Sequence, residues 1–383
     1  MMAYKFVLRI IVVIVWIFIF IGSDSSRITA KSDSVSTSLA MNVARSQHTT
    51  TLLANGNILL TGGDKGNSGL YNAEIYDPVN NTFLPVGAMN EARFVHSATL
   101  LNNKKILIAG GYNKTGFLSS AELFDPINMR FIATNPMNVL RDNHTATLLD
   151  NGKVLIVGGD NLAEGYLSSA EIYNPFTNTF TLTNSMGVGR VYHTSTLLSD
   201  GNVLVTGGIA AIGNSVGYLL SSEIYDTRTE TFYPTQDMHF CRCQHTATLL
   251  RSGEILITGG RIGANGLASA ELYNPLTGRF ETTGSMNEDR YAHTATLLNN
   301  GEVLIVGGYN ETGPLSSLEI YNPVTRSFRK AGNLNIPRVL HKASLLENGN
   351  ILVTGGYNKM DQEIHWISIA EIINYNNVLQ EMR

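Results

Sequence analysis

The sequence has few of the features that stabilise small or highly charged proteins. Only two of its 383 residues are cysteine, so disulfides are not its main stabilising device. Charged residues make up 15%, the formal net charge is −4, and Lys and Arg form no cluster. Nucleic-acid-binding proteins carry a basic cluster, so we exclude that class. Hydrophobic residues reach 43%, which indicates a large buried body.

Long hydrophobic runs are absent except at the N-terminus. Residues 10–21 contain no charge and follow Lys5 and Arg9. Twelve apolar residues behind a short basic head predict a secretory signal and are few for a membrane-spanning helix. We expect residues 1–30 to be a cleaved signal peptide or, if uncleaved, a membrane anchor. Residues 31–383 would then be secreted, or tethered to a membrane outside the cytosol.

The rest of the chain consists of one sequence unit repeated seven times. Residues 290–308, RYAHTATLLNNGEVLIVGG, are its clearest copy: Arg, then His three residues later, an apolar stretch and Gly-Gly. The copies are 48 to 52 residues apart, a period typical of propellers. The units start near Met41, Met89, Met137, Met186, Met238, Met286 and Leu334.

Each unit contains the patterns of four strands. Residues 293–298 and 302–306 flank an Asn-Asn-Gly turn, and residues 318–321 and Phe328 mark two further strands. Four antiparallel strands make one propeller blade. Residues 35–45 align with 83–93, which contain a fourth strand, whereas the last unit has no late Phe. We therefore expect an all-β, single seven-bladed propeller whose N-terminal strand pairs with the seventh blade.

Arg-x-x-His, Gly-Gly, Glu-[Ile/Leu]-[Tyr/Phe], [Asp/Asn]-Pro and a late aromatic together resemble kelch repeats. More closely, the chain is similar to the kelch-type propeller of the galactose oxidase superfamily. The resemblance covers nearly everything after residue 34 and implies a fold rather than a function. Phe replaces the usual kelch Trp, at Phe83, Phe131, Phe180, Phe232, Phe280 and Phe328.

Galactose oxidase-like enzymes hold copper with two Tyr and two His, and one Tyr is cross-linked to Cys. The resemblance implies Tyr192 and His193 as one adjacent Tyr–His pair. In that family the second His comes from a domain after the propeller, and neither Cys241 nor Cys243 matches the cross-linked Cys. We therefore expect no cofactor, no metal and no catalytic residue. A copper-radical oxidase or sugar-processing enzyme is the disfavoured alternative.

Each unit carries one Arg, one Glu and one His at equivalent positions. Equal counts predict a structural Arg–carboxylate pair in every blade; the alternative is an arginine ring for an acidic ligand. The histidines, at 48, 96, 144, 193, 245, 293 and 341, are expected to form hydrogen bonds between blades rather than to bind metal. The pairs would join Arg45, Arg93, Arg141, Arg190, Arg242, Arg290 and Arg338 to Glu74, Glu122, Glu171, Glu223, Glu271, Glu319 and Glu371.

Binding is expected where loops vary on a rigid scaffold. The connection between the second and third strands varies in length, and it shares one end of the ring with the Arg-x-x-His loops. A protein or glycan would bind a monomeric propeller there; a purely structural surface protein is a third possibility. The alternative for Trp366 is that it only packs its own loop. The candidate ligand-binding residues are Trp366, His365, Tyr192, Tyr291, Phe94 and Asn143.

Two smaller features remain. Asn-x-Thr sequons nominate Asn80, Asn113 and Asn310 as glycosylation sites, the last two in loops after Gly-Gly. Cys241 and Cys243 are one residue apart, and they would either form a strained disulfide or stay reduced.

Overall fold

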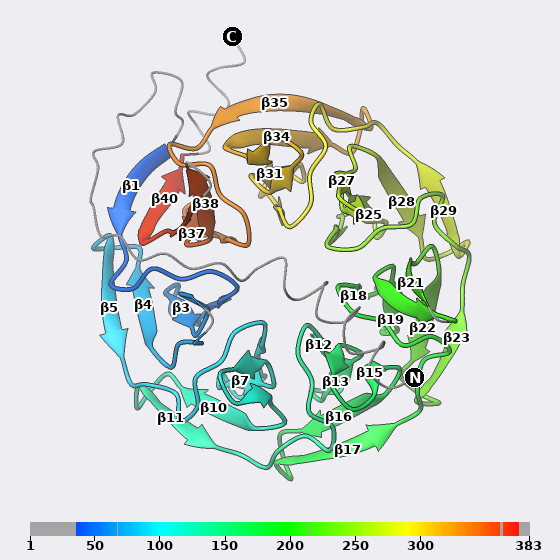
Figure 1. Cartoon of the computed structure of the whole chain (residues 1–383), viewed down its shortest axis with the longest axis horizontal. Helices are drawn as coiled ribbons and strands as arrows, with labels where there is room; N and C mark the ends of the chain where they lie inside the picture. The colour runs from blue at the N-terminus through cyan, green and yellow to red at the C-terminus, as the bar shows by residue number, and fades with distance from the viewer. Residues whose placement is uncertain (1–35, 67, 214, 361–362, 375–383) are drawn as a thin grey trace.

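Seven four-stranded antiparallel sheets stand around a central axis in the computed structural model (Figure 1). The structure describes residues 36–66, 68–213, 215–360 and 363–374. All the regular elements in these ranges are β-strands, and no helix there is long and apolar enough to cross a membrane. The all-β, seven-bladed prediction is confirmed. The predicted signal or anchor in residues 1–30 lies outside the described residues.

Six blades are formed by consecutive strands of one repeat each. In chain order they are β2 (Thr49–Leu52), β3 (Ile58–Thr61), β4 (Ala73–Asp77) and β5 (Thr82–Val86); β6 (Ser97–Leu100), β7 (Ile106–Ala109), β10 (Ala121–Asp125) and β11 (Arg130–Ala133); β12 (Thr145–Leu148), β13 (Val154–Val157), β16 (Ala170–Asn174) and β17 (Thr179–Thr183); β18 (Thr194–Leu197), β19 (Val203–Thr206), β22 (Ser222–Asp226) and β23 (Thr231–Pro234); β24 (Thr246–Leu249), β25 (Ile255–Thr258), β28 (Ala270–Asn274) and β29 (Arg279–Thr282); β30 (Thr294–Leu297), β31 (Val303–Val306), β34 (Ser317–Asn322) and β35 (Ser327–Asn333).

The seventh blade joins the two ends of the described chain. It combines β36 (Lys342–Leu345), β37 (Ile351–Thr354) and β40 (Ile369–Ile373) with β1 (Ser36–Ala40) as its outermost strand. β1 pairs antiparallel with β40, from Ser36 opposite Ile373 to Ala40 opposite Ile369. The first strands β36 and β2 also contact each other, so the ring closes. The predicted closure by the N-terminal strand is confirmed.

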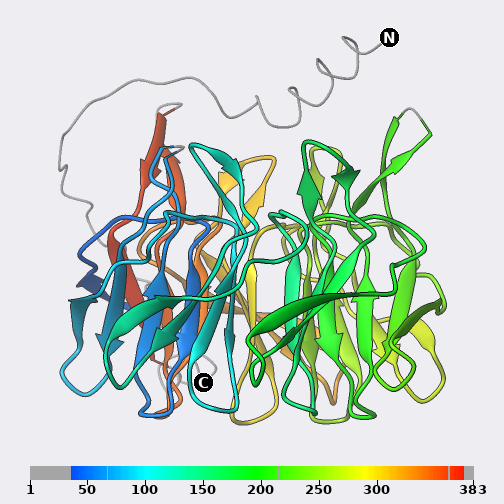
Figure 2. The same cartoon turned by 90° about the horizontal axis from the view of Figure 1, so that it is seen from below.

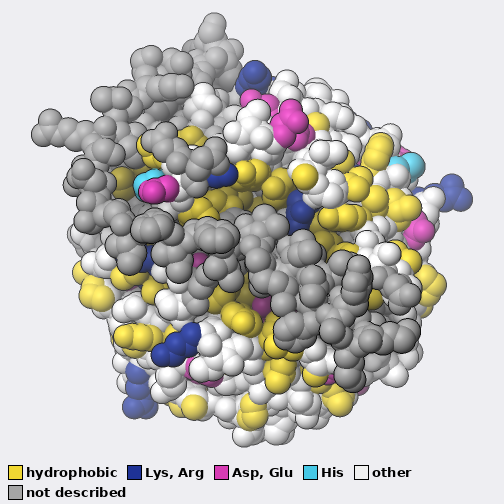
Figure 3. Space-filling model, in the orientation of Figure 1, with side chains coloured by type: hydrophobic (Ala, Val, Ile, Leu, Met, Phe, Trp, Pro, Cys, Tyr) yellow, Lys and Arg dark blue, Asp and Glu magenta, His cyan; other side chains and the backbone are white. Residues whose placement is uncertain are grey.

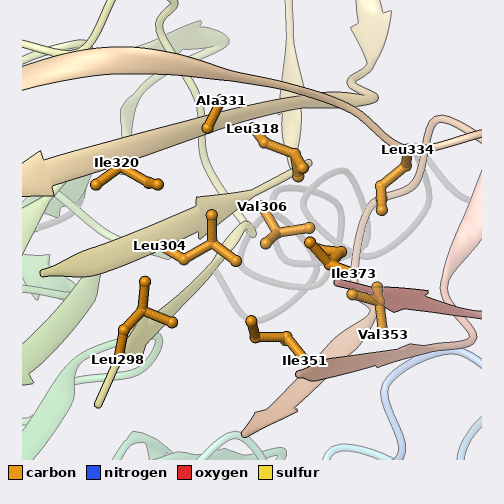
Figure 4. Close-up of a cluster of buried hydrophobic side chains, with 10 residues drawn as sticks. All are labelled: Leu298, Leu304, Val306, Leu318, Ile320, Ala331, Leu334, Ile351, Val353 and Ile373. Carbon is orange, nitrogen blue, oxygen red and sulfur yellow. The ribbon is translucent and has the colours of Figure 1, made fainter. Parts of the chain in front are cut away.

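The hydrophobic core lies between neighbouring blades. The second strand of each blade is buried at every residue, because both of its faces are covered by adjacent sheets. Figure 4 shows the cluster in which Leu304 and Ile320 of the sixth blade pack against Ile351, Val353 and Ile373 of the seventh. A single blade cannot bury both faces alone, so each blade depends on its neighbours.

The two ends of the ring differ (Figure 2). One end, here called the hairpin end, carries the Arg-x-x-His loops and the connections between second and third strands. From the second blade onward these connections are two-stranded hairpins. The opposite end, the turn end, carries the short turns. The hairpins pair β8 (Tyr112–Asn113) with β9 (Gly116–Phe117), β14 (Asp160–Asn161) with β15 (Gly165–Tyr166), β20 (Ile209–Ile212) with β21 (Ser215–Tyr218), β26 (Arg261–Ile262) with β27 (Asn265–Gly266), β32 (Tyr309–Asn310) with β33 (Gly313–Pro314), and β38 (Tyr357–Met360) with β39 (Glu363–Trp366).

Candidate binding surface at the hairpin end

Each blade contains one buried ion pair between its Arg-x-x-His loop and its third strand. In the fifth blade Nη2 of Arg242 lies 2.8 Å from Oε1 of Glu271, and neither side chain is exposed. Nη1 of Arg242 donates to the carbonyls of Gly259 at 2.6 Å and Ser269 at 3.1 Å. The other pairs, with Nη2–Oε1 distances of 2.5 to 3.1 Å, are Arg45–Glu74, Arg93–Glu122, Arg141–Glu171, Arg190–Glu223, Arg290–Glu319 and Arg338–Glu371.

The carboxylate of each pair also holds the segment that crosses from the preceding blade. Oε2 of Glu271 accepts the backbone N–H of His239 at 2.7 Å, and the equivalent Glu in each other blade accepts the equivalent N–H. Burial lowers the pKa of Arg242, and the charge of Glu271 partly opposes that shift. Because the guanidinium groups are enclosed, the arginines do not form a ring for an acidic ligand.

The seven histidines link neighbouring blades. Nε2 of His293 lies 3.1 Å from the hydroxyl oxygens of Thr246 and Thr258 in the fifth blade. Each other repeat His contacts a Thr or Ser hydroxyl of the preceding blade in the same way. Burial lowers the pKa of all seven, that of His144 to about 3, so the imidazoles are neutral. In the described part of the chain, no three or more His, Cys, Asp or Glu are grouped to hold a metal.

The Gly-Gly pairs lie where two Arg-x-x-His loops converge. A Cβ at Gly307 would be 2.8 Å from the carbonyl oxygen of Arg338 in the next blade. A Cβ at Gly308 would be 2.8 Å from the carbonyl oxygen of Tyr291 and from Cβ of His293 in its own blade. Both glycines also have positive φ. Backbone from two loops therefore approaches each Gly-Gly pair too closely for a side chain.

A belt of backbone hydrogen bonds surrounds the channel mouth. The second residue after each repeat Arg has a positive φ of 46° to 57°, although none is glycine. In six of the seven, its N–H donates to the carbonyl of the equivalent residue in the preceding blade, as Val95 does to Gln47 at 3.2 Å. A non-glycine residue with positive φ is strained, and it keeps this conformation only where the surrounding structure holds it in place. The members are Gln47, Val95, Asn143, Tyr192, Gln244, Ala292 and Leu340.

Aromatic side chains gather around this belt. Phe94 and Tyr291 form single β-bridges with Tyr112 and Tyr309, the residues that follow Gly-Gly. The ring centroids are 5.6 Å apart for Phe94–Tyr112, and 5.5 Å apart for Tyr291–Tyr309. The guanidinium carbon of Arg261 lies 5.4 Å from the centre of the Tyr291 ring. Figure 3, which views the hairpin end, shows hydrophobic side chains around the inner part of this face.

The candidate ligand-binding residues fall into two groups on this end. Phe94, Asn143, Tyr192 and Tyr291 are all partly exposed and lie in Arg-x-x-His loops at the channel mouth. Tyr192 also packs against the buried cluster of Val191, Ile209 and Cys243, so it contributes to the packing of the loops as well. His365 and Trp366 lie further out, on β39 of the last hairpin.

Trp366 does more than pack its own loop. Its indole is half-buried, and Cη2 would lie 3.7 Å from a Cβ built on Gly66 in the connection of the first blade. The ring therefore reaches across the boundary between the seventh and first blades. His365, its neighbour on the strand, is exposed.

Sequence reasoning missed a pair of carboxyl groups at the mouth. Asp142 follows a repeat Arg and Asp160 follows a Gly-Gly, and the two form a β-bridge in the third blade. Burial and the hydrogen-bonded neighbour Asp160 raise the pKa of Asp142 well above its usual value. Burial beside these carboxyls also raises the pKa of Tyr192. Eighteen residues separate the two Asp in sequence, and only the bridge between those positions could have revealed them.

Two of the three predicted glycosylation sites are not placed to carry a glycan. Asn113 and Asn310 are 4% and 6% exposed, and each Oδ1 accepts from the hydroxyl of the Thr two residues on, at 2.6 Å. Nδ2 of Asn113 donates to the carbonyl of Ala92 at 3.0 Å, which ties the hairpin to the crossing segment. A glycan on a buried Nδ2 would break these contacts, so this expectation is corrected. Asn80 is exposed, in the turn between β4 and β5.

Cys241 and Cys243 are both free thiols. Cys241 is partly exposed, whereas Cys243 is fully buried between Val191 and Ile209. Burial raises the pKa of the Cys243 thiol to about 12. In this conformation the two sulfurs are not bonded to each other.

The residues carried over from copper enzymes do not fit a copper site. Nε2 of His193 lies 3.1 Å from Oγ1 of Thr145 in the preceding blade, and the imidazole is buried between blades. Tyr192, the adjacent residue, lies at the channel mouth instead. The two side chains therefore do not converge on one position, and we derive no step through copper.

The comparisons agree with this description. The model of the Attractin/LZTR1 beta-propeller family matches residues 76–313, and that of the Kelch motif matches residues 46–90. No curated protein matches the chain. Among solved structures, a fungal alcohol oxidase of the AA5 family in complex with copper is similar, with a TM-score of 0.70 and 16% identity over 88% of this chain and 75% of that chain. An identity this low shows the fold alone.

The first of these matches covers more than half of the 383 residues, and the repeats outside it continue the same pattern of Arg, His and Gly-Gly. The chain therefore belongs to the Attractin/LZTR1 beta-propeller family and is built from kelch repeats.

Proposed function

We propose that this propeller is a binding protein that recognises a protein or a glycan through its hairpin end. Kelch propellers usually mediate interactions, and the sequence favours a chain that is secreted or tethered at the cell surface. The observation that carries the proposal is the group of partly exposed aromatic residues and Arg261 around the channel mouth. Tyr, Trp and Arg are the residues that most often dominate binding energy at interfaces.

The scaffold beneath this group is rigid. The hydrogen-bonded belt fixes the loops, and the ion pairs fix the segments that lead into them. Side chains on such a support lose little conformational freedom on binding, which favours affinity. The hairpins above them differ in length between blades, as β20–β21 and β38–β39 exceed the others. Variation on a constant support is the usual design of a recognition surface.

A glycan array and a pull-down from surface proteins would first identify a ligand. Trp366→Ala and Tyr291→Ala are then expected to weaken binding by about tenfold or more, because truncating an interface anchor costs 2 kcal/mol or more. Phe176→Ala, an aromatic at the turn end that is 89% exposed, is the matched control and should leave affinity unchanged. The melting temperature should stay the same for Phe176→Ala and fall only slightly for Trp366→Ala, whose indole also packs against the first blade. Loss of binding in the control alone would place the site at the other end.

A second candidate function is oxidation by a copper-radical enzyme, supported by the fold likeness to the copper-bound alcohol oxidase. The described residues bring together no matching ligand set, so we rank this function lower. Metal analysis of the purified full chain tests it directly. Stoichiometric copper that survives dialysis would reverse the ranking.

A further inference from the structure

We propose that the turn end of the propeller faces and contacts a lipid bilayer. Five apolar side chains protrude from this end at equivalent positions, one in each three–four turn of five blades. Their exposed fractions of 85% to 95% are nearly as high as a side chain in a folded protein can have. We call them the apolar tips: Val79, Ile127, Phe176, Leu276 and Val324.

The turn itself does not require an apolar residue at this position. In each turn the preceding Asp or Asn accepts the backbone N–H of the tip residue, as Oδ1 of Asp77 does from Val79 at 2.8 Å. The fourth blade makes the same turn around Arg228, whose N–H donates to Oδ1 of Asp226 at 2.8 Å. A charged residue is therefore accommodated without change. Nothing within the ring explains why five of the six turns expose an apolar side chain.

The arrangement of the tips suits a bilayer better than a protein partner. The apolar tips belong to different blades and are spread around the ring, whereas the core of a protein interface is one continuous apolar patch. A bilayer surface needs no such continuity, because each side chain enters the acyl boundary independently. Tips at equivalent positions of a closed ring also project from the same end of that ring, as contact with a flat surface demands.

The direction of the chain supports the same orientation. β1 leads into the loop that begins the first blade at the hairpin end, so its first residue, Ser36, lies at the turn end. The uncharged apolar residues 10–21 are joined to the propeller at that point. A segment held in a membrane would thus enter the ring on the side of the apolar tips. Lys and Arg form no cluster in the sequence, so contact should not need anionic lipid.

Tryptophan quenching in the full chain tests this contact. The chain is placed in phosphatidylcholine vesicles with brominated acyl chains, in a Trp16→Phe, Trp366→Phe background. The introduced tryptophan of Leu276→Trp is expected to lose fluorescence relative to unbrominated vesicles and to shift to shorter wavelength. The matched control is Leu162→Trp, on a hairpin tip that is 73% exposed, and its fluorescence should not change. Adding Val79→Asn, Ile127→Asn, Phe176→Asn and Val324→Asn should abolish the quenching in Leu276→Trp without lowering the melting temperature.

Three results would overturn the proposal. Quenching of Leu162→Trp alone, or of both variants equally, would mean that the turn end is not the membrane side. Absence of quenching in Leu276→Trp would mean that the ring stands clear of the lipid. A dimer in solution that the four Asn substitutions dissociate, with no quenching, would make a second copy of the chain the occupant of the apolar tips.

Discussion

Removing one charge from the buried ion pairs is expected to destabilise the whole ring. In Glu271→Gln, Arg242 stays fully buried but loses its counter-charge. The carboxylate now accepts from Nη2 of Arg242, from the backbone N–H groups of His239 and Phe240, and from Nδ1 of His239. A Gln side chain has only one oxygen to accept from these donors. Its NH₂ group would point at N–H groups that now donate to the second carboxylate oxygen.

The magnitude follows from the complete burial of both partners. Breaking a buried pair by removing one charge costs about 3–5 kcal/mol. At an unfolding entropy of about 2 cal/mol/K per residue, this loss lowers the melting temperature of a ring of this length by about 4–7 °C. Since adjacent blades depend on each other for burial, the loss should appear in one cooperative transition.

An exposed ion pair provides the matched control. Glu281 is 65% exposed and lies 3.3 Å from Arg326, so Glu281→Gln should change stability by less than about 1 kcal/mol. Thermal and urea unfolding of both variants, followed by circular dichroism, measures the difference. The double variant Arg242→Met, Glu271→Gln should lose less than the sum of its single changes. Equal shifts in Glu271→Gln and Glu281→Gln would refute the argument that the repeat pairs are buried and coupled.

Three further predictions concern the histidines and the N-terminus. The buried histidines stay neutral while an unfolded histidine takes up a proton near pH 6.5, so stability should be constant above that pH and fall below it. Each histidine that stays neutral lowers the free energy of unfolding by about 1 kcal/mol at about pH 5.5, and a melting temperature independent of pH between about 5 and 7 would contradict this. Deleting residues 31–41 removes β1 and the buried Met41, which alone is worth about 2–5 kcal/mol, and an unchanged melting temperature would disprove closure by this strand. If residues 10–21 belong to a cleaved signal, N-terminal sequencing should find a start within residues 23–31; Met1 or Met2 on membrane-bound protein would indicate an anchor instead.

The fold was predictable from the sequence because every blade has the same packing requirements at the same positions of its repeat. Second strands such as β31 (VLIV) have to be covered on both faces, and Gly-Gly has to lie under two loops. Closure was predictable because β1 has the pattern of a fourth strand that no preceding strands accompany. The pairing of Arg242 with Glu271 followed from equal numbers of the two residues in every repeat. The requirements on second strands, Gly-Gly and the ion pairs recur seven times, so they stand out from the variable positions.

The structure of the hairpin end was less predictable because it depends on contacts between different segments of the chain. Strands of two residues, such as β14, show no periodicity, so the connections resembled polar loops. Positive φ at Val95 and Leu340 comes from the belt around the channel, since neither residue favours that conformation. Asn113 matched a surface sequon, but its side chain binds Thr115 and Ala92 and is buried. Each of these features depends on contacts that a single repeat cannot reveal.

Asn80 offers an independent check on which end faces the membrane. It is exposed and adjacent to Val79 in the first three–four turn, where its Nδ2 donates to Oδ2 of Asp77 at 2.8 Å. A glycan at this position would be a bulky, hydrated group beside an apolar tip, and it would hold that part of the turn end away from lipid. Glycan at Asn80 and insertion of Val79 into a bilayer therefore exclude each other within one molecule. If the turn end contacts the membrane, mass spectrometry of the exported protein should find the peptide around Asn80 unmodified. Full occupancy of Asn80 would show that the turn end faces solvent in the cell, and the contact proposed for the apolar tips would then be wrong.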